Sequence, residues 1–191
     1  MKKLLVLVLV FGMSSAASAA LQISVNGDKN PVDSEIVLYP SDEIILDIWT
    51  DAVINLGGSG EYILVVNITL GSISGGESAF DASDPEGWIS AVQGLTTEYP
   101  AVIPPVGMEG IFATYANSDF ATFEAIPAGT VLADQILFTC MGEGDAVINL
   151  WGLDGNQAYT DLMDSVVIHQ IPEPATMLLL GFGGLFLRRK K

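Results

Sequence analysis

Short runs in which apolar and polar residues alternate limit the fold of this chain more than any other feature of its sequence. Between residues 44 and 49, for example, Ile44, Leu46 and Ile48 occupy every second position. A period of two places the apolar side chains on one face of a strand. Turn residues separate the runs, and no window has the period of a long amphipathic helix. The chain is therefore predicted to be all-β.

The number and spacing of these runs favour an antiparallel sandwich of two sheets with a jelly-roll order of strands. The predicted strands are 21–25, 35–38, 44–49, 62–70, 111–115, 121–124, 131–140, 146–151 and 165–171. Residues 71–105 are rich in Gly, Ser, Asp and Pro, so an irregular stretch is expected there, with one short strand at 87–89. A β-helix is less favoured, because no regular short repeat is present.

Residues 1–19 have the three parts of a secretory signal peptide. Lys2 and Lys3 are followed by an apolar core at residues 4–13 and by the small-residue pattern Ala17-Ser18-Ala19. This order predicts a signal helix that directs the chain to the Sec export machinery and is cleaved before Ala20.

The C-terminus combines a rigid triplet, an apolar stretch and a basic end. The two prolines of the triplet Pro172-Glu173-Pro174 cannot lie inside a helix and favour extended backbone, so the triplet stands clear of the segment that follows. Residues 175–187 are predicted to form a short anchor helix, with the terminal cations on the cytoplasmic side. The apolar residues are Met177, Leu178, Leu179, Leu180, Phe182, Leu185, Phe186 and Leu187, and the cations are Arg188, Arg189, Lys190 and Lys191. Because a full span needs about 17–20 residues, the anchor is marginal, and a core-packed or disordered helix is the alternative.

In order and residue type, this tail resembles the PEP-CTERM sorting signal of Gram-negative bacteria that make extracellular polymeric substance. The resemblance implies that the chain is exported and held transiently in the inner membrane. It also implies that a membrane-embedded exosortase cuts the chain near residues 172–174, and that the product reaches the cell surface or the extracellular matrix. The resemblance covers the tail alone.

Residues 20–170 are predicted to form one domain, and this domain is strongly acidic. All 23 Asp and Glu residues of the chain except Glu173 lie in it, whereas Lys29 is the only one of the seven Lys and Arg residues, so the formal balance is −21. Such a surface repels phosphate backbones, which excludes nucleic acid as a partner. It suits solubility, salty surroundings or the binding of divalent cations.

Calcium is the one cofactor that the sequence brings into consideration, because this ion takes oxygen ligands from loops. Asp154, Asn156 and Asp161 are the candidate ligands. They resemble a calcium loop only in part, since Ala158 stands where a further oxygen is needed and the full Asp-x-Asp-x-Asp-Gly pattern is absent. An ordinary acidic turn is the alternative.

The residues offer little for catalysis. His169 is the only histidine and is expected on the outer face of the last strand, where a general base has no partners. Cys140 is the only cysteine and is expected to be a small buried hydrophobe. Asp81, Asp84 and Glu86 form an acidic loop that could bind or hydrolyse sugars, but such a loop is ordinary in so acidic a chain. The prediction is a non-enzyme, with a secreted hydrolase as an alternative.

Residues 126–150 resemble the late strands of cohesin-like domains, with a turn, a long strand, the glycine turn Gly142-Glu143-Gly144-Asp145 and a further strand. The resemblance implies a cohesin-like sandwich, but no binding residue can be matched position by position. Two readings follow: a structural or adhesive protein of the matrix, or a module that binds a polysaccharide or a dockerin-like partner. Exposure of tryptophans on a flat sheet face would favour binding, and burial of all three would favour a structural role. These tryptophans are Trp49, Trp88 and Trp151.

Overall fold

A computed structural model describes residues 21–55, 57–78, 88–95, 105–117, 125–154, 156 and 158–172. The predicted signal helix at 1–19, the anchor at 175–187, the acidic loop at 81–86 and the strand at 121–124 lie outside these residues. In the part of the chain that is described, no helix has the length and apolar character needed to cross a membrane.

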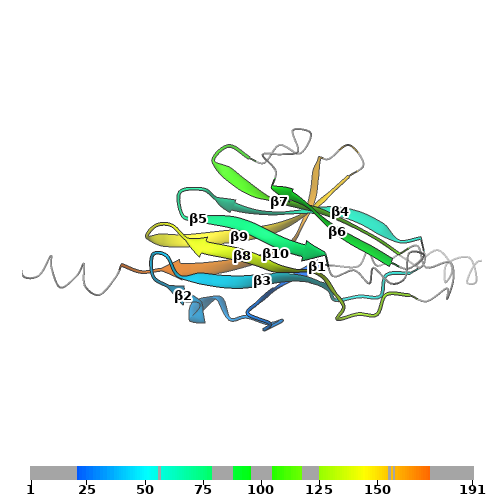
Figure 1. The fold of residues 1–191 in the computed structure, drawn as a ribbon, viewed down its shortest axis with the longest axis horizontal. Coiled ribbons are helices and arrows are strands. Elements are labelled where there is room, and N and C mark those ends of the chain that lie inside the picture. The colour runs from blue at the N-terminus through cyan, green and yellow to red at the C-terminus, as the bar shows by residue number, and fades with distance from the viewer. Residues whose placement is uncertain are drawn as a thin grey trace, which may run out of the picture.

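The described residues form two β-sheets that lie face to face (Figure 1). The four-stranded sheet has the order β1-β3-β8-β5, and the six-stranded sheet has the order β2-β10-β9-β4-β7-β6. The strands are β1 Leu21–Val25, β2 Val37–Leu38, β3 Glu43–Thr50, β4 Ser59–Asn67, β5 Gly71–Ser78, β6 Trp88–Leu95, β7 Met108–Asn117, β8 Val131–Cys140, β9 Gly144–Leu153 and β10 Tyr159–Gln170. A short 3-10 helix, η1 Asp33–Glu35, precedes β2. For the described residues, the predictions of an all-β fold and of two sheets are confirmed.

Neighbouring strands pair antiparallel with a single exception among the described pairs. Strand β2 runs parallel to the end of β10, where Val37 lies opposite His169 and Leu38 opposite Gln170. The last strand therefore has β9 on one side and the two-residue strand β2 on the other.

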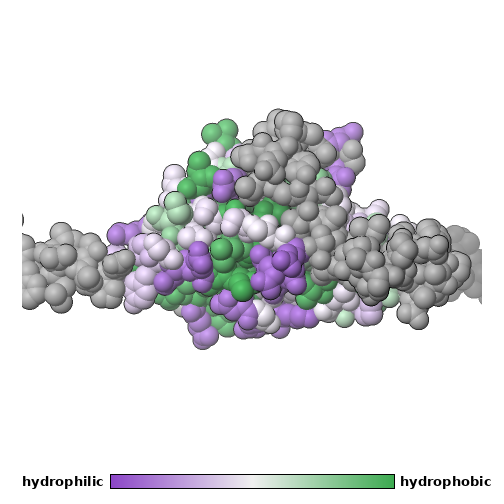
Figure 2. Space-filling view, viewed as in Figure 1, coloured by the Kyte–Doolittle hydropathy of each residue, from purple (hydrophilic) through white to green (hydrophobic). Residues whose placement is uncertain are grey.

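The core lies between the two sheets and follows from the alternation in the sequence. Ile44, Leu46 and Ile48 of β3 are at most 5% exposed, while Glu43, Ile45 and Asp47 turn outward. The larger buried side chains that join them from both sheets are Leu21, Ile23, Tyr62, Leu64, Ile73, Ile111, Leu132, Phe138, Ile148 and Ile168. On the visible part of one face, apolar residues are interspersed with hydrophilic ones (Figure 2).

The prediction of an irregular stretch from residue 71 was wrong for two strands. Strand β5 begins at Gly71 and pairs with β8, and β6 extends from Trp88 to Leu95 rather than ending at residue 89. Strand β5 carries mostly Ser and Gly, and only Ile73 provides an apolar side chain, so period-two analysis had no signal to find. Gly71 is required there, because a Cβ atom would collide with the Phe138 ring.

Other strand limits also shifted. Strand β4 ends at Asn67 rather than at residue 70, because Leu70 N donates to Asn67 O (3.0 Å) and closes a turn that exposes Ile68. The predicted strand 35–38 shortens to β2, since Glu35 belongs to η1. The last strand starts at Tyr159, earlier than predicted.

Candidate functional site

The end of β10 leads directly into the predicted sorting triplet. His169 N donates to Ile36 O (2.9 Å), and Ile171 N donates to Leu38 O (3.0 Å). Ile171 is thus still held by the fold, and Pro172 is the next residue. Of the predicted tail residues, Pro172 alone is described; Glu173, Pro174, the anchor residues and the terminal cations lie outside the described residues.

A buried amide lies at this end of β10. Gln170 is 4% exposed and follows Val166 and Ile168 in the row of β10 side chains that face the core. Within the described part of the chain, neither its Oε1 nor its Nε2 atom has a hydrogen-bond partner. A buried amide without partners destabilises the folded state, so the strand end before the triplet is a weak place in the fold. The sequence analysis missed it.

His169 faces outward, as its place in the alternation predicted. Its Nδ1 atom lies 2.8 Å from Asp145 Oδ1 across the β9–β10 pair, and the two side chains are 36% and 63% exposed. The pair ties the end of β10 to the start of β9. No serine, threonine or cysteine side chain bonds to His169 among the described contacts, so this pair stands without a nucleophile.

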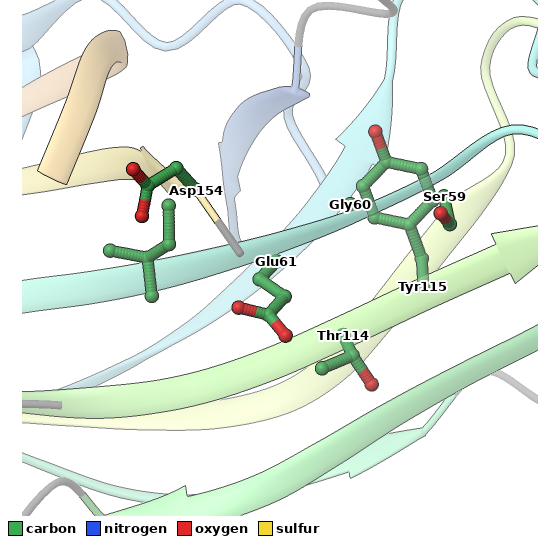
Figure 3. A pocket seen from close by; sticks show the side chains of 7 residues that line it. Ser59, Gly60, Glu61, Thr114, Tyr115 and Asp154 are labelled. Carbon is green, nitrogen blue, oxygen red and sulfur yellow. The ribbon is translucent and has the colours of Figure 1, made fainter. Parts of the chain in front are cut away.

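An open pocket of about 360 Å³ lies at the other end of the six-stranded sheet (Figure 3). Its walls come from β4, β7 and the end of β9. Glu61 of β4 lies opposite Thr114 of β7 and opposite Leu153 of β9 in the strand register. The lining residues are Ser59, Gly60, Glu61, Thr114, Tyr115, Leu153 and Asp154.

The polar atoms of this pocket are mainly oxygens. Glu61 Oε2 is buried and has no hydrogen-bond partner among the residues that the structure describes. Gly60 allows the Tyr115 ring to pack against β4, since a Cβ there would meet the ring at 2.7 Å, and burial raises the pKa of Tyr115. Figure 3 shows the Glu61 and Thr114 side chains close together and the Asp154 carboxyl group farther away. Such a pocket offers hydrogen-bond acceptors and hydroxyls to a neutral or cationic ligand. The sequence analysis missed it, because the pocket depends on the pairing of strands distant in sequence.

Asp154 was predicted as a calcium ligand and shapes the turn between β9 and β10. Its Oδ1 atom accepts hydrogen bonds from Asn156 N (2.8 Å) and Ala158 N (3.0 Å), and these bonds lower the pKa of Asp154. Asn156 and Asp161 are exposed, and Asp161 lies in β10. Within the described residues, no three His, Cys, Asp or Glu side chains are placed to hold a metal ion. The calcium site stays a prediction.

Two of the three tryptophans can be placed, and both are partly buried. Lys29 Nζ lies 4.9 Å from the centre of the Trp49 ring and donates to Gly129 O (2.7 Å). Trp151 meets Tyr159 edge to face, with ring centres 6.0 Å apart. The side chain of Trp88 lies outside the described residues, so the exposure of the tryptophans does not distinguish a binding module from a structural protein.

Cys140 is 1% exposed, as predicted for a small buried hydrophobe. Its Sγ atom contacts Gly142 O at 3.5 Å, and burial raises the pKa of the thiol. A raised pKa keeps the thiol protonated at neutral pH and therefore weakly reactive.

Comparisons with known proteins match the tail and the sandwich separately. Residues 170–191 match the PEP-CTERM protein-sorting motif, a motif that indicates export and membrane-anchored sorting to the cell surface. No curated protein sequence matches this chain.

Among solved structures, the sandwich is similar to cohesin modules at low sequence identity. A cohesin module of a family 33 glycoside hydrolase from Clostridium perfringens is 12% identical, with a TM-score of 0.47 over 81% of this chain and 99% of that one. A type I cohesin–dockerin complex from Clostridium thermocellum gives 14% identity and a TM-score of 0.44 over 80% and 99%. A type II cohesin domain from the cellulosome of Acetivibrio cellulolyticus gives 10% and 0.41 over 79% and 95%. Similarity at these levels of sequence identity and TM-score gives no information about a binding partner of this chain.

Proposed function

We propose that this chain is an exported, non-catalytic protein of the cell surface or extracellular matrix, with a structural or adhesive role. The match of residues 170–191 to the PEP-CTERM protein-sorting motif carries this proposal. The matched segment begins at Gln170, within β10, so the sorting signal is continuous with the last strand of the sandwich.

The proposed route has four stages. The Sec machinery exports the chain, and the signal peptide at residues 1–19 is removed before Ala20. The apolar stretch at 175–187 and the cations at 188–191 then hold it in the inner membrane of a Gram-negative bacterium. An exosortase recognises Pro172-Glu173-Pro174 and cuts near it, and domain 20–170 passes to the surface.

A non-catalytic role is supported by the chemistry of the described side chains. The chain's only histidine is paired with an exposed carboxylate on a strand, and its only cysteine is buried with a raised pKa. A domain with 22 acidic residues and one lysine is suited to a hydrated matrix, because its own charge keeps copies apart.

The second candidate is a binding module with a jelly-roll, cohesin-like sandwich. The observation that favours it is the pocket at Glu61, where a buried carboxylate oxygen has no hydrogen-bond partner among the described residues. Carboxylates and hydroxyls of this kind suit the hydroxyl groups of a neutral polysaccharide or a polar partner of the dockerin type. A calcium ion bound by Asp154, Asn156 and Asp161 would add a further contact beside the pocket, since Asp154 is one of its lining residues.

The intact mass and the location of the protein in its native host test the proposed route. We expect surface or matrix material that lacks the residues before Ala20 and those after about residue 174. Replacing the triplet by alanines should leave export intact and cause the uncut form to accumulate in the inner membrane. Equal surface delivery of that variant would overturn the sorting proposal.

A further inference from the structure

We propose that residues 169–171, at the end of β10, form a latch that must open before the triplet 172–174 can be processed. The inference rests on the proposed function, because it assumes that an enzyme acts at the triplet. It adds a step that the motif does not specify, namely local opening of the folded domain. Leu38 and Gln170, which lie outside the triplet, control this opening.

The latch is closed in the structure. On one side, the His169 and Ile171 amides donate to carbonyl oxygens of Ile36 and Leu38. On the other side, Gln170 lies opposite Gly144 in β9. No free residue separates the last hydrogen-bonded position, Ile171, from the first proline of the triplet. The backbone before the triplet is therefore unavailable to an enzyme that binds an extended substrate.

The short distance between the folded domain and the membrane also limits the access of a membrane-embedded enzyme to the triplet. The apolar stretch begins at residue 175, four residues after Ile171. Four extended residues span at most about 14 Å. A single helix with its side chains is about 10–12 Å wide, so the closed fold leaves almost no room for an enzyme between the domain and the membrane. Opening of residues 169–171 would lengthen the tether by about 10 Å.

The composition of the latch makes it easy to open. Strand β2 contributes only two residues to the pairing. Gln170 lies in the same inward-facing row of β10 as the apolar residues Val166 and Ile168, and its buried amide has no partner among the described residues. Opening returns this amide to water, which offsets part of the loss of strand pairing. The end of β10 should therefore open locally while the rest of the sandwich stays folded.

Two substitutions should move the opening equilibrium in opposite directions. Gln170→Met keeps an unbranched side chain of similar length and removes the unpaired amide, so the open fraction should fall about tenfold. Leu38→Ala removes a buried side chain from β2, so the open fraction should rise about tenfold or more. When opening is faster than cleavage, the rate of processing follows the open fraction.

The experiment measures two quantities on the full-length chain. Pulse-chase labelling in the native host gives the half-life of the uncut form of each variant. Amide hydrogen exchange of the purified uncut chain in detergent micelles gives the opening of His169 and Ile171. We expect slower exchange and slower processing in Gln170→Met, and faster exchange and faster processing in Leu38→Ala.

Gln135→Gly is the matched control. Gln135 is exposed, lies in β8 and has a positive φ of 55°, so glycine should stabilise the domain without touching the latch. Its processing should equal that of the native chain. Exchange of the Ile171 amide at the unprotected rate in the native chain would overturn the latch, as would native processing rates in both latch variants despite altered exchange. Failure of the proposed function is distinct, since it would appear as normal processing of the triplet-to-alanine variant.

Discussion

The two ends of the sandwich each bury a side-chain amide, but they differ in whether that amide has a hydrogen-bond partner. At the closed end, defined by residues 50–55, 57, 58, 117 and 126–130, Asn117 is 1% exposed and its Nδ2 donates to Ile54 O (2.9 Å). At the exit end, where β10 finishes beside β2 on the left of Figure 1, Gln170 is 4% exposed and its amide has no partner in the described part of the chain.

The difference shows that the same chemical group can stabilise one part of a fold and destabilise another. Backbone bonds surround Asn117, since Gly57 N donates to its carbonyl and its own N–H donates to Gly58 O, both at 2.8 Å. Ile54 and Ile126 also exchange two backbone bonds there. A buried amide with partners adds to the stability of such a network, whereas one without partners subtracts from it. The closed end is therefore expected to open last.

Asn117→Ala should produce the largest effect of the substitutions that test this comparison. The variant loses the bond to Ile54 and leaves a cavity, so the free energy of unfolding should fall by about 2 kcal/mol. For a domain of this size, that corresponds to a melting temperature lower by about 4–8 °C. Thermal unfolding of residues 20–170 measures it.

Asn30→Ala is the matched control, because Asn30 is exposed and only its backbone N–H is bonded, to Asp28 Oδ1 (3.0 Å). Its effect should stay within about 0.5 kcal/mol. Equal losses from both substitutions would remove the distinction between the two ends, since the buried network would then have no special weight.

The parts of this fold that sequence patterns predict are those in which one strand carries its own signal. Ile44, Leu46 and Ile48 alternate and are buried, and His169 was correctly placed on the outer face of the last strand. Strand β5 carries no such signal, because Ser and Gly dominate it and its position depends on the Phe138 ring of β8.

Features that require two segments distant in sequence could not be predicted from local sequence patterns. The pocket needs Glu61 beside Thr114, which lie in different strands whose register no local pattern specifies. The predicted strand 111–115 ended before Asn117, whose partner Ile54 is 63 positions away. The buried amide of Gln170 was not predicted either, because whether a partner meets it depends on every surrounding element.

Lys29→Met should produce the next largest loss in the free energy of unfolding, and it tests a second contact at the closed end. Lys29 Nζ joins the loop after β1 to Gly129 O and lies over Trp49, so both a charged hydrogen bond and a cation–π contact are lost. The expected loss is about 1.5 kcal/mol. A double-mutant cycle with Trp49→Leu separates the ring contact from the hydrogen bond. Additive losses would show that the ring contributes nothing through the lysine.

Asp134→Asn should produce the smallest effect, and its sign depends on pH. The pKa of Asp134 is raised above its ordinary value of 3.8 by burial and then by the charges of Asp47 and Glu77. A raised pKa means that the folded state binds the proton more tightly than the unfolded state, so this carboxyl lowers stability as the pH rises through the folded-state pKa. Asparagine should therefore raise the free energy of unfolding at pH 7 by about 0.5 kcal/mol, since the group is partly exposed. The gain should vanish below pH 3.8, where the carboxyl is neutral in both states. Chemical denaturation of the native chain and of Asp134→Asn at pH 7 and below pH 3.8 measures this gain in stability. A gain that is independent of pH would mean that charge repulsion is not its cause.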